Sequence, residues 1–172
     1  LDFVFKSEAE DTFAGLLKLY SKKTNPNLVQ LKKCKGIAFN AKNMGLSKDD
    51  NFIVTEDRDF IVDLDTLPEP LYEQLPLKNY WAPFLGNYVF IEASRGCPYR
   101  CIFCRQGVMY NWKFRTKSGK RLAKEAIDLA KQGVELVLFH GDTFTVNKKV
   151  IKELCEELIK SPTKVVWACN TH

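Results

Sequence analysis

The sequence lacks several features that would assign it to a specialised class of protein. Among its 172 residues, no apolar run approaches the roughly 18 residues that a membrane-spanning helix needs. No basic start followed by an apolar stretch marks a secretory signal. The net charge is +5, but the basic residues are scattered as pairs such as Lys32-Lys33, not gathered in the stripe of a nucleic-acid-binding surface. We therefore expect a soluble, cytoplasmic protein and do not expect nucleic acid as a partner.

The chain is also too short for a complete (β/α)8 barrel, which typically takes about 250 residues. Its composition, 45% apolar and 12% aromatic, is nevertheless that of a globular chain able to bury a core. It begins at Leu1 instead of Met. We therefore expect the chain to be a piece of a longer product.

Residues 1–21 are predicted to form one strand and one helix. Residues 1–5, which are apolar except for Asp2, suit a short buried strand, and Ser7 with Glu10 has the spacing of a capping box at the start of a helix. The helix would carry one apolar face, made of Phe13, Leu16, Leu17 and Tyr20. Since nothing precedes the strand, this unit resembles the end of a domain.

Residues 22–84 show a weaker pattern. Short strands are expected at 37–39, 52–54 and 59–62. The stretch 64–70 cannot hold a helix, because its two prolines lack an N–H and restrict the residues before them. We interpret 22–84 as a connecting segment with a small β-meander and a Pro-rich linker.

Residues 85–172 alternate apolar runs with amphipathic stretches. Strands are expected at 88–91, 134–139 and 164–169, with helices that begin after Ser118 and Asn147. Gly133 is placed to end the first of these helices. Strands and helices alternating at this spacing predict an α/β fold with parallel βαβ units and right-handed crossovers.

Three of the six cysteines form the series Cys97-x3-Cys101-x2-Cys104 directly after the first of these strands. A structural zinc site and a ferredoxin-type cluster each take four protein ligands. Three thiolates can instead hold three corners of a [4Fe–4S] cluster and leave one iron open to a substrate or cofactor. A disulfide is the weaker interpretation, because reducing intracellular conditions keep thiols free.

This spacing resembles that of the radical S-adenosylmethionine (radical SAM) superfamily, and the string SRGCPYRCIFC at 94–104 resembles its cobalamin-binding subgroup. The resemblance implies that Cys97, Cys101 and Cys104 ligate a [4Fe–4S] cluster with SAM on the open iron. It implies that Phe103 contacts the adenine of SAM. The implied reaction is reductive cleavage of SAM to methionine and a 5′-deoxyadenosyl radical.

The segment after the second strand reads HGDT, from His140 to Thr143. Relatives carry a Gly-Gly-Glu motif there that receives the methionine amine, so the resemblance implies this role for Asp142, with Gly141 beside it. His140 could be a ligand, a proton donor or, as the favoured interpretation, a hydrogen-bonded polar residue at a strand end. Cys169 could face the cavity, although a buried free cysteine is the commoner case.

The N-terminal residues resemble the last strand and helix of a B12-binding domain, in which a Gly-Glu-Gly-Glu element precedes the helix. Here Ser7 and Ala9 stand in place of the glycines. Residues 63–70 and 113–115 also resemble the cobalamin subgroup. The implied architecture is a partial radical SAM (β/α) barrel of three strands and two helices (85–172), preceded by the tail of a Rossmann-like B12-binding domain (1–21) and a β-containing linker (22–84).

The resemblance implies a fragment of a radical SAM enzyme, which we expect to be inactive alone. Cobalamin would be a further cofactor of the full-length protein, and the reaction would be methyl transfer to an unactivated carbon or a cyclisation. A small-molecule substrate and a one-electron reductant, such as a flavodoxin or ferredoxin, are the expected partners. The alternatives are a methylthiotransferase acting on tRNA or protein, and a non-catalytic iron–sulfur or zinc-binding module.

Overall fold

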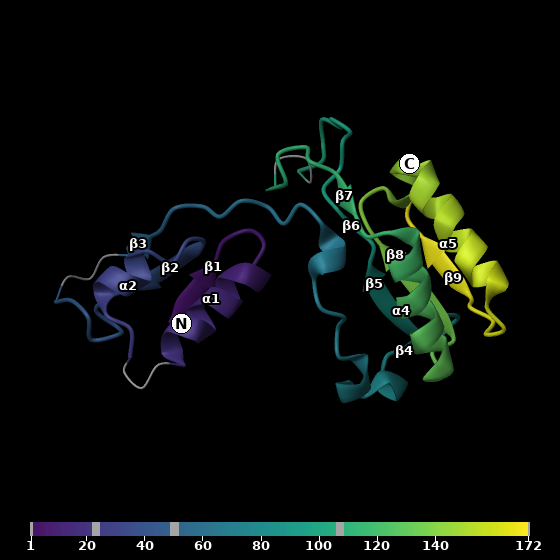
Figure 1. Cartoon of the computed structure of the whole chain (residues 1–172), viewed down its shortest axis with the longest axis horizontal. Coiled ribbons are helices and arrows are strands. Elements are labelled where there is room, and N and C mark those ends of the chain that lie inside the picture. Colours follow the sequence, from purple (N-terminus) through teal and green to yellow (C-terminus); the bar gives the residue numbers. More distant parts are fainter. Residues whose placement is uncertain (1, 22–24, 49–51, 106–108, 172) are drawn as a thin grey trace. The chain divides into compact units, whose positions relative to one another are not determined.

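The structure is a computed structural model that describes residues 2–21, 25–48, 52–105 and 109–171. Leu1 and His172, the ends of the first and last predicted segments, lie outside the described residues. The chain forms two compact units, Leu1–Ile61 and Val62–His172 (Figure 1).

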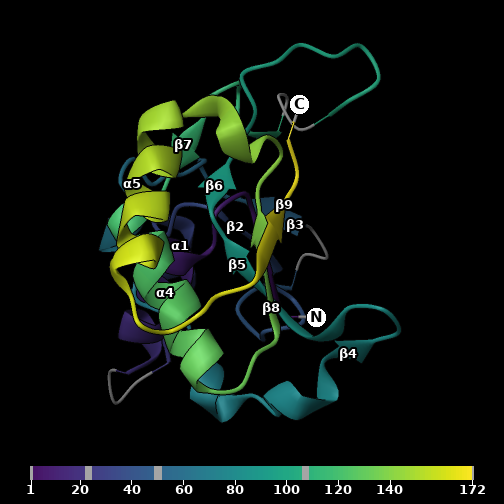
Figure 2. The same ribbon diagram turned by 90° about the vertical axis from the view of Figure 1, so that its right-hand side faces the viewer.

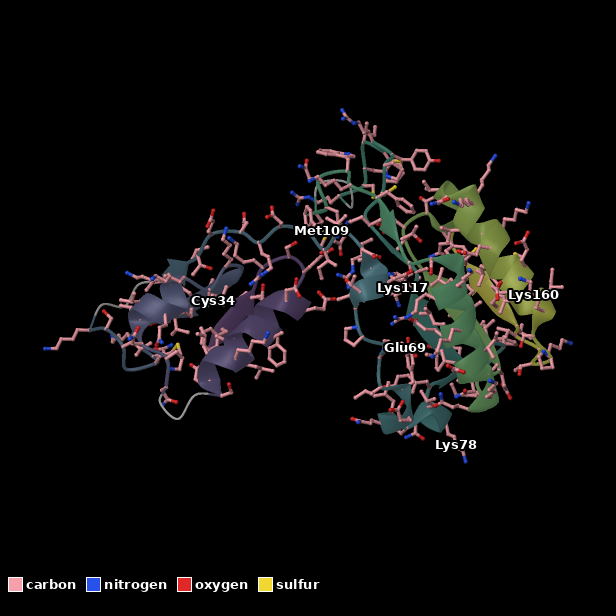
Figure 3. All side chains as sticks on the ribbon, in the orientation of Figure 1. Cys34, Glu69, Lys78, Met109, Lys117 and Lys160 are labelled. Atoms are coloured by element: carbon pink, nitrogen blue, oxygen red, sulfur yellow. The ribbon has the colours of Figure 1, made fainter. Side chains whose placement is uncertain are left out.

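The N-terminal unit is a small antiparallel sheet packed against two helices. Strands β1 (Phe3–Phe5), β2 (Ile37–Asn40) and β3 (Phe52–Val54) pair in the order β1-β2-β3. Helices α1 (Glu10–Tyr20) and α2 (Leu28–Lys32) share a core with one face of this sheet. That core includes Leu16, Leu31, Cys34, Ile37 and Phe39; Figure 3 labels Cys34.

The first strand has a partner that the sequence analysis missed. β1 pairs with β2, so the sheet joins residues on both sides of position 21. The expected strand at 59–62 is wrong, because no strand occurs there. Instead, the backbone N–H of Ile61 donates to a carboxylate oxygen of Glu8 at 2.7 Å, so a side chain takes the place of a neighbouring strand.

The capping box expected at Ser7 and Glu10 does not form. Helix α1 begins at Glu10 after the N-cap residue Ala9, which makes no side-chain cap. Ser7 lies two residues before the N-cap and has a left-handed backbone (φ +58°), so Glu10 occupies the first helical position instead of the third. A complete capping box occurs instead at α2, between Asn27 and Gln30.

The C-terminal unit contains the predicted parallel βαβαβ arrangement. Strands β5, β8 and β9 are parallel neighbours, and a short antiparallel strand, β4, extends the sheet beside β5. Figure 2 shows α4 and α5 side by side on one face of this sheet. The bounds are β4 (Trp81–Ala82), β5 (Gly86–Glu92), α4 (Gly119–Lys131), β8 (Leu136–His140), α5 (Lys148–Lys160) and β9 (Trp167–Cys169).

Local signals placed both helices correctly. The Ser118 hydroxyl accepts from the Arg121 N–H at 3.1 Å, and Asn147 caps α5 in the same way. Gly133 has φ +90° just beyond the end of α4, as its predicted role in ending the helix requires. In the described ranges, no helix is long and apolar enough to cross a membrane.

Helices α4 and α5 cross with almost no space between their backbones. A Cβ on Gly119 would lie 2.5 Å from the backbone nitrogen of Leu154 and from the carbonyl oxygen of Val150. The Gly119 N–H also donates to the Glu153 carboxylate at 2.8 Å. Glycine at the start of α4 therefore sets the distance between the two helices that cover the sheet.

The Pro-rich linker lies along α4. It holds no α-helix, as predicted, but a single 3-10 turn at Leu64–Thr66. The Asp65 carboxylate accepts from the Ser118 backbone N–H at 2.9 Å, and Glu69 pairs with Lys124 at 2.7 Å. These contacts attach the linker to the C-terminal unit.

Candidate cofactor site

The three clustered cysteines lie on a loop anchored at the carboxyl edge of the parallel sheet. Strands β6 (Ser94–Arg95) and β7 (Arg115–Thr116) pair as an antiparallel stem at the base of this loop. The Ala93 N–H donates to the His140 carbonyl at 2.7 Å, which ties the stem to the end of β8. Figure 2 shows the loop ribbon extending beyond that end of the sheet. The loop thus lies where open α/β sheets bind their ligands.

Two glycines allow the backbones at the base of the loop to approach closely. Gly96 has φ +76°, and a Cβ there would lie 2.3 Å from the carbonyl oxygen of Lys113. A Cβ on Gly141 would lie 2.1 Å from the Ser94 hydroxyl oxygen. Gly141 therefore has a structural role, which is to bring the segment after β8 against β6.

The three predicted cluster ligands differ in exposure. Cys97 is buried, Cys101 is half-buried and Cys104 is exposed, and all three are free thiols. The Cys104 N–H donates to the Cys101 carbonyl at 3.1 Å, so these two residues share a tight turn. Across the described stretches of chain, no three His, Cys, Asp or Glu side chains converge on a common metal position. The loop therefore carries the three thiols without gathering them.

The chemistry of these donors nevertheless fits an iron–sulfur cluster. Three thiols lie within residues 97–104, and none is committed to a disulfide. Thiolate is the ligand that iron–sulfur clusters take from proteins. The thiols of Cys97 and Cys101 are at least partly covered, whereas Cys104 lies at the surface. Gathering them requires the loop to close around the inserted group.

The same loop exposes apolar side chains that the scaffold leaves uncovered. Phe103 is 87% exposed, and its neighbour Ile102 is fully exposed. Nearby, the Arg100 guanidinium lies 5.3 Å from the centre of the Trp112 ring. The loop therefore presents aromatic and apolar surface beside the third cysteine, where a ligand with a flat ring would cover it.

A small polar cleft lies at the base of the loop, beside the ends of β5 and β8. Its volume is about 70 Å³, so it has room for a small polar group and not for a nucleoside. Arg95 is buried and makes two hydrogen bonds to the Glu92 carboxylate, at 3.0 and 2.8 Å. The cleft is lined by Glu92, Ser94, Arg95, Gly96, Tyr110, His140, Gly141 and Asp142.

Gly141 and Asp142, which the sequence analysis singled out, both line this cleft. Burial raises the pKa of the Asp142 carboxyl, and the neighbouring His140 opposes that rise. The His140 ring is exposed and lies edge-on to Phe90, with ring centres 5.9 Å apart. A cation placed in the cleft would favour the charged form of Asp142.

Cys169 lies on β9 and packs against the core of the C-terminal unit, half-buried. Burial raises the pKa of its thiol. The structure therefore places Cys169 as a packing residue and does not bring it into the cleft.

Sequence reasoning missed a buried charge cluster behind the site. The Lys117 ammonium is 2.9 and 3.0 Å from the two Glu125 carboxylate oxygens, and both side chains are almost fully buried. The Arg121 guanidinium adds a hydrogen bond of 2.6 Å to the same carboxylate. Figure 3 labels Lys117 where the chain enters α4. The spacing of Arg121 and Glu125 is a helical signal, but nothing local indicates that Lys117 joins them.

The cysteine loop lies within a stretch of chain that matches a known protein family. Residues 91–171, which include the cysteine loop and every residue that lines the cleft, match the model of the Radical SAM superfamily. This part of the chain belongs to the radical SAM superfamily. The resemblance inferred from the cysteine spacing is therefore confirmed.

Curated relatives include methyltransferases and cyclases. An uncharacterized methyltransferase of Pyrococcus horikoshii is 29% identical over 99% of this chain and 35% of its own length. The anaerobic magnesium-protoporphyrin IX monomethyl ester cyclase of Cereibacter sphaeroides is 31% identical over 99% of this chain and 27% of its own length. The chain thus spans about a third or less of the length of these relatives.

Solved structures share its fold. The cobalamin-dependent S-adenosylmethionine radical enzyme OxsB, with aqua-cobalamin and S-adenosylmethionine bound, superimposes with a TM-score of 0.62 at 18% identity, over 96% of this chain and 22% of OxsB. A second neighbour is the radical S-adenosylmethionine methyltransferase TsrM from Kitasatospora setae, with cobalamin and a [4Fe–4S] cluster bound. Its TM-score is 0.59 at 14% identity, over 92% of this chain and 30% of TsrM. The predicted mixed α/β class is therefore confirmed.

Proposed function

We propose that this radical SAM chain holds a [4Fe–4S] cluster through Cys97, Cys101 and Cys104 and binds SAM at the open iron. The observation that carries the proposal is the set of three free thiols on one loop, rooted at the carboxyl edge of a parallel sheet. Held by these three thiolates, a cluster would supply the electron for reductive cleavage of SAM to methionine and a 5′-deoxyadenosyl radical. The protein's own part is to hold SAM still and to keep water from the reacting bond.

The surrounding residues suit the two ends of SAM. The small cleft fits the methionyl end, with the Asp142 carboxylate paired to its ammonium group and Gly141 keeping the approach open. The exposed ring of Phe103 fits the adenine, because a flat purine stacked on it would cover surface now open to water. Burial raises the pKa of Asp142 in the ligand-free protein, and the ammonium group of SAM would lower that pKa by favouring the charged carboxylate.

The relatives narrow the reaction. Methyl transfer or cyclisation on a small molecule agrees with the names of the curated relatives. Cobalamin as a further cofactor of the full-length protein agrees with the cobalamin bound in OxsB and TsrM. Residues 1–21 would then be the end of a B12-binding domain, 22–84 the connecting segment and 85–172 the start of a partial (β/α) barrel. The parallel order β5-β8-β9 supports the barrel assignment. The electron would come from a one-electron donor such as a flavodoxin or ferredoxin.

Anaerobic reconstitution of the full-length gene product with iron and sulfide tests this proposal. We expect about four iron and four sulfide per chain, and formation of 5′-deoxyadenosine when SAM and a one-electron reductant are added. A protein that binds iron but never cleaves SAM would instead be a non-catalytic iron–sulfur module. Retention of a corrin through gel filtration tests cobalamin binding separately.

A further inference from the structure

One buried polar contact links the cysteine loop to the segment after β8. The Thr143 hydroxyl oxygen lies 3.7 Å from the Cys97 sulfur, within hydrogen-bond distance for a sulfur atom. Thr143 is 4% exposed and Cys97 is 8% exposed, so water does not compete for either group. The two residues are 46 positions apart in the chain. The contact therefore depends on the fold and not on local sequence.

The backbone on both sides holds Thr143 in place. Just before it, Gly141 lies against Ser94, where no larger residue would fit without displacement. Just after it, the Phe144 N–H donates to the Asn170 carbonyl at 3.0 Å, and the Phe144 ring stacks on Phe139 at 5.1 Å in the core. The sheet thus holds the Thr143 hydroxyl in place, while Cys97 lies near the start of the loop.

The chemistry of the pair fixes the direction of the hydrogen bond once a cluster is bound. A free thiol can donate or accept, but a ligand sulfur is a thiolate and can only accept. The Thr143 hydroxyl must then be the donor. Hydrogen bonds to the sulfur ligands of iron–sulfur clusters are among the factors that set reduction potential, because they stabilise the added negative charge of the reduced form.

We propose that Thr143 donates a hydrogen bond to the Cys97 ligand sulfur and thereby raises the reduction potential of the cluster. The inference rests on the proposed function, since it needs the cluster to be bound through Cys97. The hydroxyl makes the cluster easier for the one-electron donor to reduce. Because its proton stays on oxygen throughout, Thr143 tunes the electron transfer and takes no part in breaking the SAM bond.

The test is a redox titration of the reconstituted full-length protein in three variants. Thr143→Val keeps the shape and removes the hydroxyl, and we expect a midpoint potential more negative than that of the wild type. Thr143→Ser keeps the hydroxyl, and we expect it to restore the wild-type potential. Thr145→Val is the matched control: Thr145 lies on the same segment as Thr143, its hydroxyl pairs with that of Thr171, and its removal should leave the potential unchanged.

A second measurement on the wild type decides the outcome even where Thr143→Val fails to fold. In the paramagnetic resonance spectrum of the reduced cluster, the Thr143 hydroxyl proton should give a strongly coupled signal. That signal should be lost when the proton is exchanged in D2O. An absent proton, or a Thr143→Val potential equal to the wild type in a protein with full iron content, would overturn the role of Thr143. Wild-type protein that assembles no cluster would instead overturn the proposed function, so the two failures are distinguishable.

Discussion

The scaffold and the cysteine loop of the C-terminal unit differ in how far their side chains are buried. The scaffold is β5, β8 and β9 with α4 and α5, and its core side chains, such as Ile91 and Leu154, are completely buried. Even its charged Lys117 and Glu125 are buried and paired. The loop between β6 and β7 instead exposes Phe103 and leaves its three thiols ungathered. The scaffold buries its side chains without a ligand, whereas the loop leaves apolar side chains exposed.

The largest expected effect comes from a substitution that disrupts the cysteine loop and leaves the scaffold intact. Cys101→Ala should remove nearly all of the iron bound after reconstitution, because two thiolates cannot hold a cluster that needs at least three protein ligands. The free energy of unfolding of the iron-free variant should stay within about 0.5 kcal/mol of the wild type, since the loop supports no core. Cys155→Ala, on α5, is the control for iron content. Full iron retention in Cys101→Ala would refute the ligand assignment.

The converse substitution destabilises the scaffold and leaves the cysteine loop unchanged. Glu125→Gln leaves the Lys117 ammonium buried without a carboxylate, and breaking a buried pair in this way costs about 3–5 kcal/mol of unfolding free energy. Urea denaturation of the iron-free protein would measure the loss. Glu156→Gln, at an exposed pair on α5, should cost less than about 1 kcal/mol. Equal losses of unfolding free energy in the two variants would contradict the assignment of Lys117 and Glu125 as a buried ion pair.

Two glycines give a smaller and sharper contrast. Gly119→Ala should destabilise the protein by about 1–3 kcal/mol, because the new methyl group meets the backbone of α5 at 2.5 Å. Gly15→Ala, inside α1, should stabilise it by about 0.5–1 kcal/mol, because its nearest neighbour, an Arg58 side-chain nitrogen, is 3.8 Å away and alanine favours the helix. Changes of the same sign in thermal unfolding would contradict this packing.

The smallest expected effect is a pH dependence at Tyr72, which packs against the core of the scaffold. Burial, followed by the Glu125 and Glu92 carboxylates, raises the pKa of the Tyr72 phenol to about 12. The folded protein therefore keeps a proton that the unfolded chain loses above about pH 10. This contribution to stability is complete below pH 10 and is lost as the pH rises toward 12. The urea midpoint of Tyr72→Phe should fall less steeply than that of the wild type over this pH range. Equal slopes for the two proteins would contradict the raised pKa of Tyr72.

What the sequence predicted well depends on short-range chemistry. Ser118 and Asn147 begin their helices and Gly133 ends one, because a cap is made within a few residues of the chain. The cysteine series is equally local, because all three cysteines lie within eight residues on a single loop. These signals were enough for the α/β class and for the superfamily.

What it missed depends on contacts between distant residues. The partner of β1 is more than thirty positions away, and the 59–62 segment is held by a Glu8 side chain instead of a strand. The contact between Thr143 and Cys97 spans 46 positions, so no spacing rule could find it. Ser7 shows the converse: a correct local pattern failed because the chain takes a left-handed turn at that residue.

The most direct test of the central claim is the paramagnetic resonance spectrum of the reduced, reconstituted protein with and without SAM. If three thiolates leave one iron open and SAM occupies it, the spectrum must change when SAM is added. Phe103→Ala and Asp142→Asn should each require more SAM for the same change, because they remove the contacts proposed for its two ends. A cluster whose spectrum ignores SAM at every concentration would contradict the account.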